Sequence, residues 1–287
     1  MGTLFQQRLE AAALTTESAL ERLLSRDPVP GEEARPARLV DAMRYAVLGG
    51  GKRLRPFLLI ECARLLGAEG RAVVDAAAAL ECIHAYSLVH DDLPAMDDDD
   101  VRRGRPTVHK AFDEATAILA GDALLTIAFD IAASADAAPA VRVELVAALA
   151  RAAGVGGMAG GQMLDLAEDA TWDEAALRAM QAMKTGALFA FAAEAGALFA
   201  SAPAVERDRM RRFGRHFGAA FQLADDIDDV IRDGAAGRPS LATLLGPEAA
   251  RAMIGQEADA ALALLAPFGE RADPLAGAVR FMVASAR

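Results

Sequence analysis

Residues 76–100 read AAAALECIHAYSLVHDDLPAMDDDD, an apolar run that leads directly into a dense group of carboxylates. The run has helical periodicity and is rich in alanine, the strongest helix former. Pro94 has no amide hydrogen to donate, so we expect the helix to end there. Asp91 and Asp92 then lie on its last turn, and Asp97 curls back from the following loop.

Six carboxylates fall within the ten residues Asp91–Asp100. Carboxylates near the C-terminus of a helix oppose the helix dipole and repel one another, so a cation is expected to offset them. Hard oxygen ligands without a pattern of His or Cys ligands favour Mg²⁺, which is usually shared with a phosphate group. The alternative is a solvated acidic loop, which is what most runs of charge are.

A second acidic cluster, FQLADDIDD, occupies residues 221–229 inside a helical pattern. Asp225 and Asp229 are four residues apart and share one face of that helix. Like charges at this spacing destabilise an ordinary helix, and a cation would again relieve them. Two such helices could hold a magnesium–phosphate complex from both sides.

A phosphate ligand also requires basic groups, and residues 49–56 (GGGKRLRP) supply the first set. Lys52 and Arg55 are the candidates for anion contacts, whereas we interpret Arg53 as a surface charge. The segment is not a Walker A loop, because Ala46 stands where that loop has its first glycine.

Three further positions extend the basic set. Arg102 and Arg103 follow the first acidic cluster directly, and Lys184 and Thr185 form another pair. His84 lies in the same apolar helix as the first cluster. A lone histidine there is more often a core residue, and an anion contact becomes plausible only beside the residues of the 49–56 segment.

The whole chain has 287 residues, 54% of them hydrophobic, and a formal net charge of −11. This composition is typical of a soluble globular protein, and the acidic excess argues against nucleic acid as a partner. Cys62 and Cys82 are too few for a disulfide framework or a zinc site. No signal peptide is recognisable in residues 1–14, so we expect a reduced, cytoplasmic setting.

Helical patterns follow one another along the chain, and no convincing strand interrupts them. No break is long enough to be a linker, so we predict one all-α domain, residues 1–287, of about ten helices. The most apolar stretch, Gly186–Val205, is built on alanine and contains Glu194. We interpret it as a buried core helix and predict no membrane span.

From about Leu39 to Gly246 the chain resembles the trans-prenyltransferases, or polyprenyl synthetases. Residues 87–104 are particularly similar to the bacterial farnesyl diphosphate synthases, which share the four-residue gap between Asp92 and Asp97. The resemblance rests on three segments: Gly50–Pro56, His84–His109 and Phe221–Asp233.

The resemblance implies an all-α, isoprenoid-synthase-type helical bundle around a central cavity, usually in a homodimer. It implies condensation of isopentenyl diphosphate with an allylic diphosphate, most simply to farnesyl diphosphate. It also implies about three Mg²⁺ ions bound with the allylic diphosphate. By match to the motifs, Asp91, Asp97 and Asp225 would hold the ions, with Asp92 and Asp229 in support.

The same resemblance distributes the other roles. Arg102, Lys184 and Gln222 would contact the allylic diphosphate. Oxygen atoms of Lys184, Thr185 and Gln222 would face the developing allylic cation. The isopentenyl diphosphate site would comprise Lys52, Arg55, His84 and Arg103.

Product length is set in the family just before the first cluster, where this chain has Tyr86 and Ser87. A bulky aromatic side chain at Tyr86 would close the bottom of the cavity and stop chain growth early, which resembles the farnesyl pattern. Geranyl and geranylgeranyl diphosphate are the alternative products.

The chain departs from the family at Asp228, where an apolar residue is usual, and in the short loop after Asp233. There Arg238 is the only basic candidate for a diphosphate contact. Two other functions remain open. A class I terpene cyclase usually has a different second metal motif, and an inactive regulatory subunit usually loses aspartates that this chain keeps.

Overall fold

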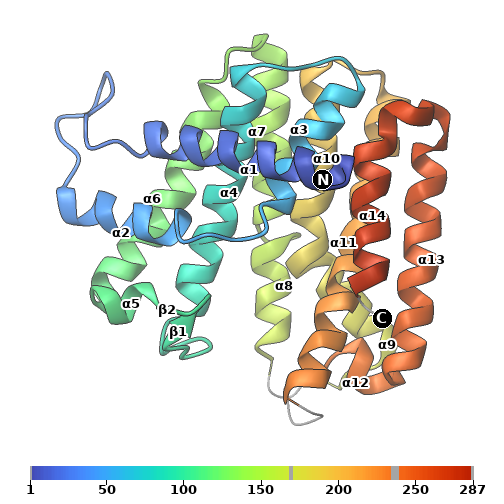
Figure 1. Ribbon diagram of the computed structural model, residues 1–287. Helices are drawn as coiled ribbons and strands as arrows, with labels where there is room; N and C mark the ends of the chain where they lie inside the picture. Colours follow the sequence, from blue (N-terminus) through green and yellow to red (C-terminus); the bar gives the residue numbers. More distant parts are fainter. Residues whose placement is uncertain (1, 168–170, 234–238, 286–287) are drawn as a thin grey trace. The chain divides into compact units, whose positions relative to one another are not determined.

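The computed structural model describes residues 2–167, 171–233 and 239–285, and its regular structure is almost entirely helical (Figure 1). This confirms the predicted all-α class. Its α-helices are α1 (Leu4–Leu23), α2 (Ala37–Val47), α3 (Leu54–Leu65), α4 (Arg71–Asp91), α5 (Val108–Ala111), α6 (Glu114–Ala133), α7 (Pro139–Ala153), α8 (Met158–Asp165), α9 (Glu174–Gln181), α10 (Ala187–Phe199), α11 (Ala204–Asp233), α12 (Leu241–Leu245), α13 (Pro247–Leu265) and α14 (Asp273–Ser285). A π-helical turn, η1 (Ala182–Gly186), joins α9 to α10, and a 3₁₀ segment, η3 (Ala266–Ala272), joins α13 to α14.

The described residues thus form fourteen α-helices, more than the ten or so that the sequence predicts. The surplus comes from short pieces, since α5 has 4 residues and α12 has 5. Segments of one turn leave too little periodicity for a sequence pattern to reveal them.

The structure adds two short strands, for which the sequence has no convincing pattern. Strands β1 (Val101–Arg102) and β2 (Arg105–Pro106) form a small antiparallel hairpin. Its two-residue turn places Arg103 at φ 53° and Gly104 at φ 74°, the left-handed backbone that tight hairpin turns require. Two-residue strands with an arginine in the turn carry no signal of alternating hydrophobicity.

The contacts within the chain divide it into two compact units. Unit 1 comprises Met1–Arg8, Leu58–Glu69 and Ala147–Arg287, and unit 2 comprises Leu9–Phe57 and Gly70–Val146. The units are interleaved along the sequence, so neither corresponds to a continuous half of the chain. The single domain over residues 1–287 remains a prediction.

In unit 2, α4 packs along α6, and a glycine allows the close approach. A Cβ atom on Gly121 of α6 would lie 2.1 Å from Nε2 of His90 on α4. The same His90 nitrogen lies 3.1 Å from the carbonyl oxygen of Ile118. The end of α4 that carries the first acidic cluster is therefore held firmly against α6.

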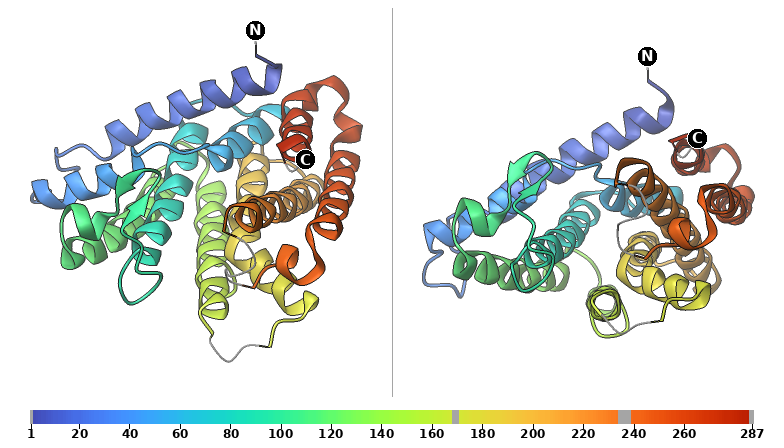
Figure 2. Two further views of the ribbon diagram at one scale, coloured as in Figure 1. Left: turned by 60° about the horizontal axis from the view of Figure 1, so that its bottom comes forward. Right: turned by 90° about the horizontal axis from the view of Figure 1, so that it is seen from below.

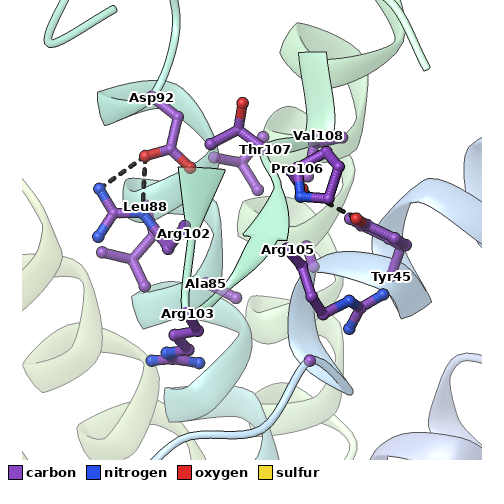
Figure 3. Close-up of a pocket in the computed structure, with 13 residues that line it drawn as sticks. Tyr45, Ala85, Leu88, Asp92, Arg102, Arg103, Arg105, Pro106, Thr107 and Val108 are labelled. Carbon is purple, nitrogen blue, oxygen red and sulfur yellow. Dashed lines mark hydrogen bonds and ion pairs between the residues drawn. The ribbon is translucent and has the colours of Figure 1, made fainter. Parts of the chain in front are cut away.

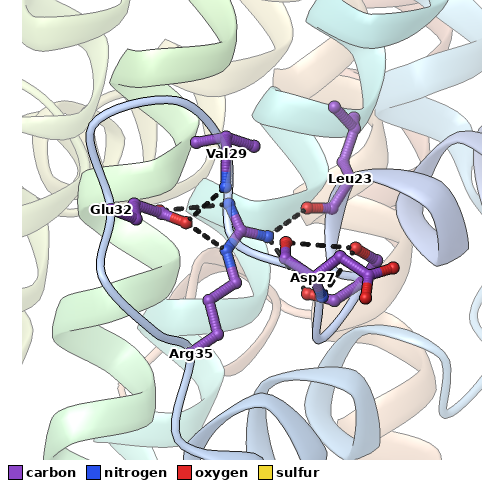
Figure 4. Close-up of polar contacts among 6 residues, drawn as sticks. Leu23, Asp27, Val29, Glu32 and Arg35 are labelled. Atoms are coloured by element: carbon purple, nitrogen blue, oxygen red, sulfur yellow. Dashed lines mark hydrogen bonds and ion pairs between the residues drawn. The ribbon is translucent and has the colours of Figure 1, made fainter.

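The loop between α1 and α2 is organised by one arginine (Figure 4). Arg35 donates hydrogen bonds to the carbonyl oxygens of Leu23 and Ser25, both at 3.1 Å. Its Nε atom pairs with Glu32 at 2.7 Å, and Glu32 also accepts a 2.9 Å bond from the amide of Val29. Arg35 thereby satisfies carbonyl groups that the end of α1 leaves open.

In unit 1, α11 packs against both α10 and α13 (Figure 2). The ring of Phe189 on α10 packs at a tilt against that of Phe217 on α11, with ring centroids 5.4 Å apart. A Cβ on Gly214 would lie 2.4 Å from the carbonyl oxygen of Phe189, so glycine permits this packing. Most of α10 is buried, from Leu188 to Leu198, which confirms that this apolar stretch forms a core helix.

Four helical stretches are long and apolar enough to cross a membrane by length and composition alone, and one of them is 67% buried inside the protein. The predicted absence of a membrane span therefore stays a prediction. The stretches are Arg71–Asp91, Glu114–Ala133, Pro139–Asp165 and Glu174–Phe199.

Candidate active site

The first acidic cluster has the local geometry that the sequence predicts. α4 ends at Asp91, and Asp92 caps it. The amide of Asp97 donates a 2.8 Å hydrogen bond to the carbonyl oxygen of Asp91, so the loop does curl back onto the helix end. Asp91 and Asp97 are both half-buried and lie close together at this point.

Asp92 has a different environment, because its side chain turns into the protein (Figure 3). It is 3% exposed and accepts a 2.6 Å hydrogen bond from Nε of Arg102 on β1. Burial raises the pKa of Asp92, while the Arg102 guanidinium acts in the opposite direction. Asp92 and Arg102 therefore form an ion pair, which connects the hairpin to the end of α4.

The hairpin turn reaches the glycine-rich segment at 49–51. Arg103 donates from Nη1 to the carbonyl oxygen of Gly50. Gly51 has a φ of 131°, a backbone conformation that favours glycine, and a Cβ there would lie 2.8 Å from the same nitrogen at the flexible end of Arg103. Arg103 is thus brought to the segment that carries Lys52 and Arg55.

A cavity of about 50 Å³ lies under the hairpin and is lined in part by Asp92, Arg102, Arg103 and Arg105 (Figure 3). This volume suits a water molecule or two and is far below the several hundred Å³ of most ligand pockets. Arg105 lies 4.0 Å above the ring of Tyr45, whose hydroxyl donates to the carbonyl oxygen of Pro106. The cavity supports the hairpin and is too small for an isoprenoid substrate.

His84 lies among the basic residues of unit 2. Burial lowers its pKa well below the ordinary value, and the positive charges of Arg55 and Arg103 lower it further. His84 is therefore neutral near pH 7 and can offer a hydrogen bond, but no positive charge. The structure brings His84, Arg55 and Arg103 within electrostatic reach of one another, as the predicted isopentenyl diphosphate site requires.

The interpretation of Arg53 as a surface charge was wrong. Its side chain is 1% exposed and pairs with the buried carboxylate of Glu81 at 2.5 Å. It also donates to the carbonyl oxygen of Val47, at the end of α2. The backbone of Arg53 is left-handed, with φ 49°, which turns its side chain inward while Lys52 stays exposed.

The two residues assigned to product length lie on α4 beside the first cluster. Tyr86 is half-buried and meets the ring of His90 edge-on, with centroids 5.9 Å apart. Burial, and then the negative charge of Asp91, raise the pKa of Tyr86. Ser87 donates its hydroxyl to the carbonyl oxygen of His84 at 2.9 Å, so its side chain serves the helix itself.

The second acidic cluster lies on α11 in unit 1. Asp225 is half-buried, and Asp229, one turn later, is exposed. Asp228 faces solvent, so the departure from the family pattern at this position is accommodated without burying a charge. The basic candidate Arg238 falls outside the described residues.

A chain of hydrogen bonds runs beside this cluster. The hydroxyl of Thr185 donates to Oε1 of Gln222 at 2.6 Å, and Nε2 of Gln222 donates to Asp226 at 2.9 Å. Gln181 donates a second amide bond to Asp226 at 2.8 Å. Asp226 is 5% exposed, and burial raises its pKa. The network fixes which end of the Gln222 amide faces Thr185.

Lys184 directly precedes Thr185, and its side chain is also held by a carboxylate. It lies on the π-helical turn η1, a distortion often found at functional sites. Its Nζ atom pairs with Asp165 on α8 at 2.7 Å. A Cβ on Gly161 would lie 2.2 Å from the backbone nitrogen of Lys184, and one on Gly218 would lie 3.1 Å from Cα of Gly186.

Sequence reasoning therefore missed several residues that position the predicted ones. For Asp226 a signal existed, because the residue belongs to the quoted cluster. For Gln181, Asp165 and Gly161 no motif pointed to a role, since their contacts depend on how α8 and η1 pack.

A further group of possible metal ligands was also missed. One ligand atom each from Asp98, Asp100 and His109 lie within 4.8 Å of one another. Asp100 also pairs with Lys110 at 2.7 Å, a cation that already offsets one of the two carboxylates. Asp98, Asp100 and His109 therefore form a group that could hold a metal ion, adjacent in sequence to the predicted ligands Asp91 and Asp97.

The predicted ligands themselves fit Mg²⁺. Asp91 and Asp97 offer carboxylates at one helix end, and Asp225 and Asp229 offer carboxylates one turn apart, all suited to a hard cation. Asp92 fits less well as a direct ligand, because its carboxylate is buried against Arg102.

A family model described as polyprenyl synthetase matches residues 36–240. Farnesyl diphosphate synthase of Escherichia coli (strain K12) is 44% identical over 272 residues, which cover 86% of this chain and 86% of that protein. Farnesyl diphosphate synthase of Geobacillus stearothermophilus is 44% identical over 229 residues, 78% of this chain and 75% of the relative.

Solved structures of prenyl synthases are also similar to this chain. An FPP/GFPP synthase from Zymomonas mobilis, in its apo form, matches with a TM-score of 0.89 and 43% identity, over 97% of this chain and 98% of that one. A geranyltransferase from Legionella pneumophila matches with a TM-score of 0.89 and 33% identity, over 98% and 97% of the two chains. The likeness confirms the isoprenoid-synthase-type fold.

Proposed function

Because this chain belongs to the polyprenyl synthetase family, we propose that it is a prenyltransferase that joins isopentenyl diphosphate head-to-tail to an allylic diphosphate. Its primers are dimethylallyl and geranyl diphosphate, and its main product is farnesyl diphosphate. Relatives named farnesyl diphosphate synthase, 44% identical over most of the chain, support this product over geranyl or geranylgeranyl diphosphate.

The geometry at the end of α4 carries the proposal. Asp92 is buried against Arg102, whereas Asp91 and Asp97 are partly exposed and linked through their backbones. One aspartate therefore supports the structure, and the other two are partly exposed at the same helix end. A solvated acidic loop would not bury one of its carboxylates.

Asp91 and Asp97, with Asp225 on α11, are the residues that would hold Mg²⁺ ions bound with the allylic diphosphate, and Asp229 supports them. When bound, these ions supply positive charge to the departing diphosphate as its C–O bond breaks. Their number, about three, follows the family and is part of the proposal.

Around this charge, the chain's own residues orient the allylic substrate. Lys184 and Arg102 contact its diphosphate, and their carboxylate partners Asp165 and Asp92 hold them in place. The oxygens of Thr185 and Gln222 face the allylic carbon that becomes electron-deficient. Since the amide of Gln222 is held by Asp226, its oxygen needs little reorganisation during the reaction.

The acceptor, isopentenyl diphosphate, occupies the basic site of unit 2. Lys52, Arg55 and Arg103 bind its charge, and neutral His84 adds a hydrogen bond. The double bond of the acceptor attacks the allylic carbon, and loss of a proton to the released diphosphate completes the step.

Tyr86 limits product length in this scheme, with Ser87 beside it. We expect Tyr86→Ala to release products longer than C15, because the ring no longer blocks the growing chain. Chromatographic sizing of the products checks this, and an unchanged product distribution would contradict it.

The remaining features follow the family. We propose one functional domain over residues 1–287, a homodimer, a cytoplasmic location, no nucleic acid partner and no membrane span. Arg238 is the remaining candidate for a diphosphate contact.

The decisive experiment incubates the purified protein with isopentenyl diphosphate and each allylic primer, with and without Mg²⁺. Magnesium-dependent formation of farnesyl diphosphate is expected. No condensation with any primer would favour an inactive regulatory subunit, and release of a cyclic hydrocarbon would identify a class I terpene cyclase.

A further inference from the structure

A cavity of about 650 Å³ lies within unit 1, among α7, η1, α10, α11 and α13. The described residues that line it include none of those assigned above to metal or diphosphate binding. Its wall does include Ala182, Met183 and Gly186 of the η1 turn, whose other residues are Lys184 and Thr185. The cavity is therefore separate from the candidate active site but shares one turn with it.

The lining is basic, although the chain as a whole has a net charge of −11. Two glutamates, Glu194 and Glu257, line it together with four arginines and a histidine, so the local surplus is two positive charges with the histidine neutral. The basic residues are Arg151, Arg178, Arg211, Arg215 and His216.

Part of this positive charge is already paired. Glu257 lies 2.7 Å from Nδ1 of His216 and 3.7 Å from Arg178. Arg211 pairs with Asp208 and lies 3.8 Å from Glu194. These contacts use both glutamates that line the cavity.

Two arginines are left over. Arg151 and Arg215 form no side-chain hydrogen bond or ion pair with any residue in the described part of the chain. Both act on the half-buried carboxylate of Glu194, whose pKa is raised by burial and lowered by the arginines around it. In addition, Nε of Arg211 is buried without a hydrogen-bond partner. Arg151 and Arg215 are exposed, and no carboxylate in the described part of unit 1 forms a direct ion pair with either of them.

The rest of the wall is apolar and made of small side chains. Alanines from three helices line it, including Ala148, Ala187 and Ala219, and Phe191 and Leu223 add larger surfaces. Short side chains leave the space open, and its volume falls within the range of pockets that hold small organic ligands.

We propose that this cavity binds a phosphorylated apolar chain, that is, an amphiphile with a phosphate or diphosphate head. The two unpaired arginines match a multiply charged, oxygen-rich head, since guanidinium groups bind phosphate through paired hydrogen bonds. The alanine-lined wall matches an apolar tail. If the chain is a prenyltransferase, its own product is one source of such a molecule, and other alkyl phosphates are another.

Equilibrium dialysis tests the proposal with three probes in the presence of EDTA: farnesyl diphosphate, dodecyl phosphate and inorganic diphosphate. Each amphiphile is expected to bind at one molecule per chain, at least tenfold more tightly than inorganic diphosphate. Equal affinities of the amphiphiles indicate a general alkyl phosphate site, and a tenfold preference for farnesyl diphosphate indicates the product. Equal binding of inorganic diphosphate, or no binding of either amphiphile, would overturn the proposal.

Charge reversal locates the binding site. Arg151→Glu combined with Arg215→Glu is expected to weaken both amphiphiles at least tenfold. Arg212→Glu is the matched control, because Arg212 lies on α11 outside the cavity and is exposed. A double variant that binds as tightly as the control would overturn the assignment to this cavity.

A second variant tests the apolar wall. Ala219→Leu projects into the cavity from the turn between Arg215 and Leu223, and it should weaken both amphiphiles while thermal melting stays unchanged. Because binding is measured without Mg²⁺ or isopentenyl diphosphate, this site and the proposed reaction can fail independently. Binding by a protein without transferase activity would contradict only the reaction.

Discussion

Asp92 in unit 2 and Asp226 in unit 1 are both buried carboxylates next to an acidic cluster, but their partners differ. Asp92 is held by the guanidinium of Arg102, which cancels its charge. Asp226 is held by the neutral amides of Gln181 and Gln222, which leave its charge in place. Burial raises the pKa of both carboxyls, and in both cases the hydrogen bonds act against that change.

The difference concerns what each carboxylate can control. An ion pair anchors one element to another, and here it fastens the β1–β2 hairpin to the end of α4. An amide has a distinct donor end and acceptor end, so fixing one end fixes the other. Asp226 therefore sets the orientation of Gln222 and, through it, the contact with Thr185. We expect replacement of Asp92 to affect mainly stability and replacement of Asp226 to affect mainly turnover, whereas replacement of Arg102 should affect both.

The largest effect is expected from Gly161→Ala, which attacks the π-turn directly. The added Cβ would lie 2.2 Å from the backbone nitrogen of Lys184, an atom that cannot move aside as a flexible side chain can. We expect kcat to fall at least a hundredfold and the free energy of unfolding to fall by about 3 kcal/mol. Kinetics with geranyl diphosphate and urea unfolding measure both.

Gly255→Ala on α13 is the matched control, since a Cβ there would meet nothing within 4 Å. It should leave kcat unchanged and raise stability slightly, by up to about 1 kcal/mol, because alanine favours a helix. Equal behaviour of the two alanine variants would contradict the steric argument.

The next effect is expected from Arg102→Leu, which leaves the Asp92 carboxylate buried without its cation. We expect a loss of about 3 kcal/mol in the free energy of unfolding, since an uncompensated buried charge is costly. Adding Asp92→Asn should restore part of this loss, because the amide has no charge to strand. A double variant no more stable than Arg102→Leu alone would argue against the ion pair as the cause.

A smaller effect on stability, but a clear one on turnover, is expected from Asp226→Asn. The new amide nitrogen would face the donor amide of Gln181 or Gln222, so one hydrogen bond is lost and Gln222 is free to turn. We expect about 1 kcal/mol of destabilisation and roughly a tenfold fall in kcat. Asp228→Asn, at an exposed position on the same helix, should change neither quantity.

The smallest effect is the dependence of stability on pH. The pKa of Asp226 is raised above its ordinary value of 3.8, so the folded state holds this proton more tightly than the unfolded state. Its contribution is fully present below pH 3.8 and is lost as the pH rises through the raised pKa. Urea unfolding from pH 4 to 7 should therefore show the stability of wild type falling relative to that of Asp226→Asn as the pH rises.

The features that the sequence predicts correctly depend on local rules. Pro94 ends α4 because its ring nitrogen has no hydrogen, whatever surrounds it. The return of Asp97 to Asp91 follows from that helix end. Similarly, the burial of α10 follows from a run of residues that has almost no polar face. In each case the information lies within a few residues of the outcome.

What the sequence missed depends on contacts between distant segments. Nothing near Lys184 indicates that Gly161 lies against its backbone or that Asp165 binds its ammonium group. The residues of the π-helical turn have no sequence pattern that distinguishes them from those of the α-helices on either side. Asp226 had a chemical signal but no assigned role, because its neighbours on the motif attracted the metal interpretation.

Arg53 shows how a contact with a distant segment changes the interpretation of a mutational scan. It stands between Lys52 and Arg55, yet its guanidinium is buried against Glu81 while theirs are the candidates for anion binding. In a survey of every substitution, Arg53 would be the least tolerant of the three, although it would touch no substrate. Intolerance to replacement at this segment therefore identifies the anchor, and only ligand-dependent kinetics would identify the residues on either side as the binding groups.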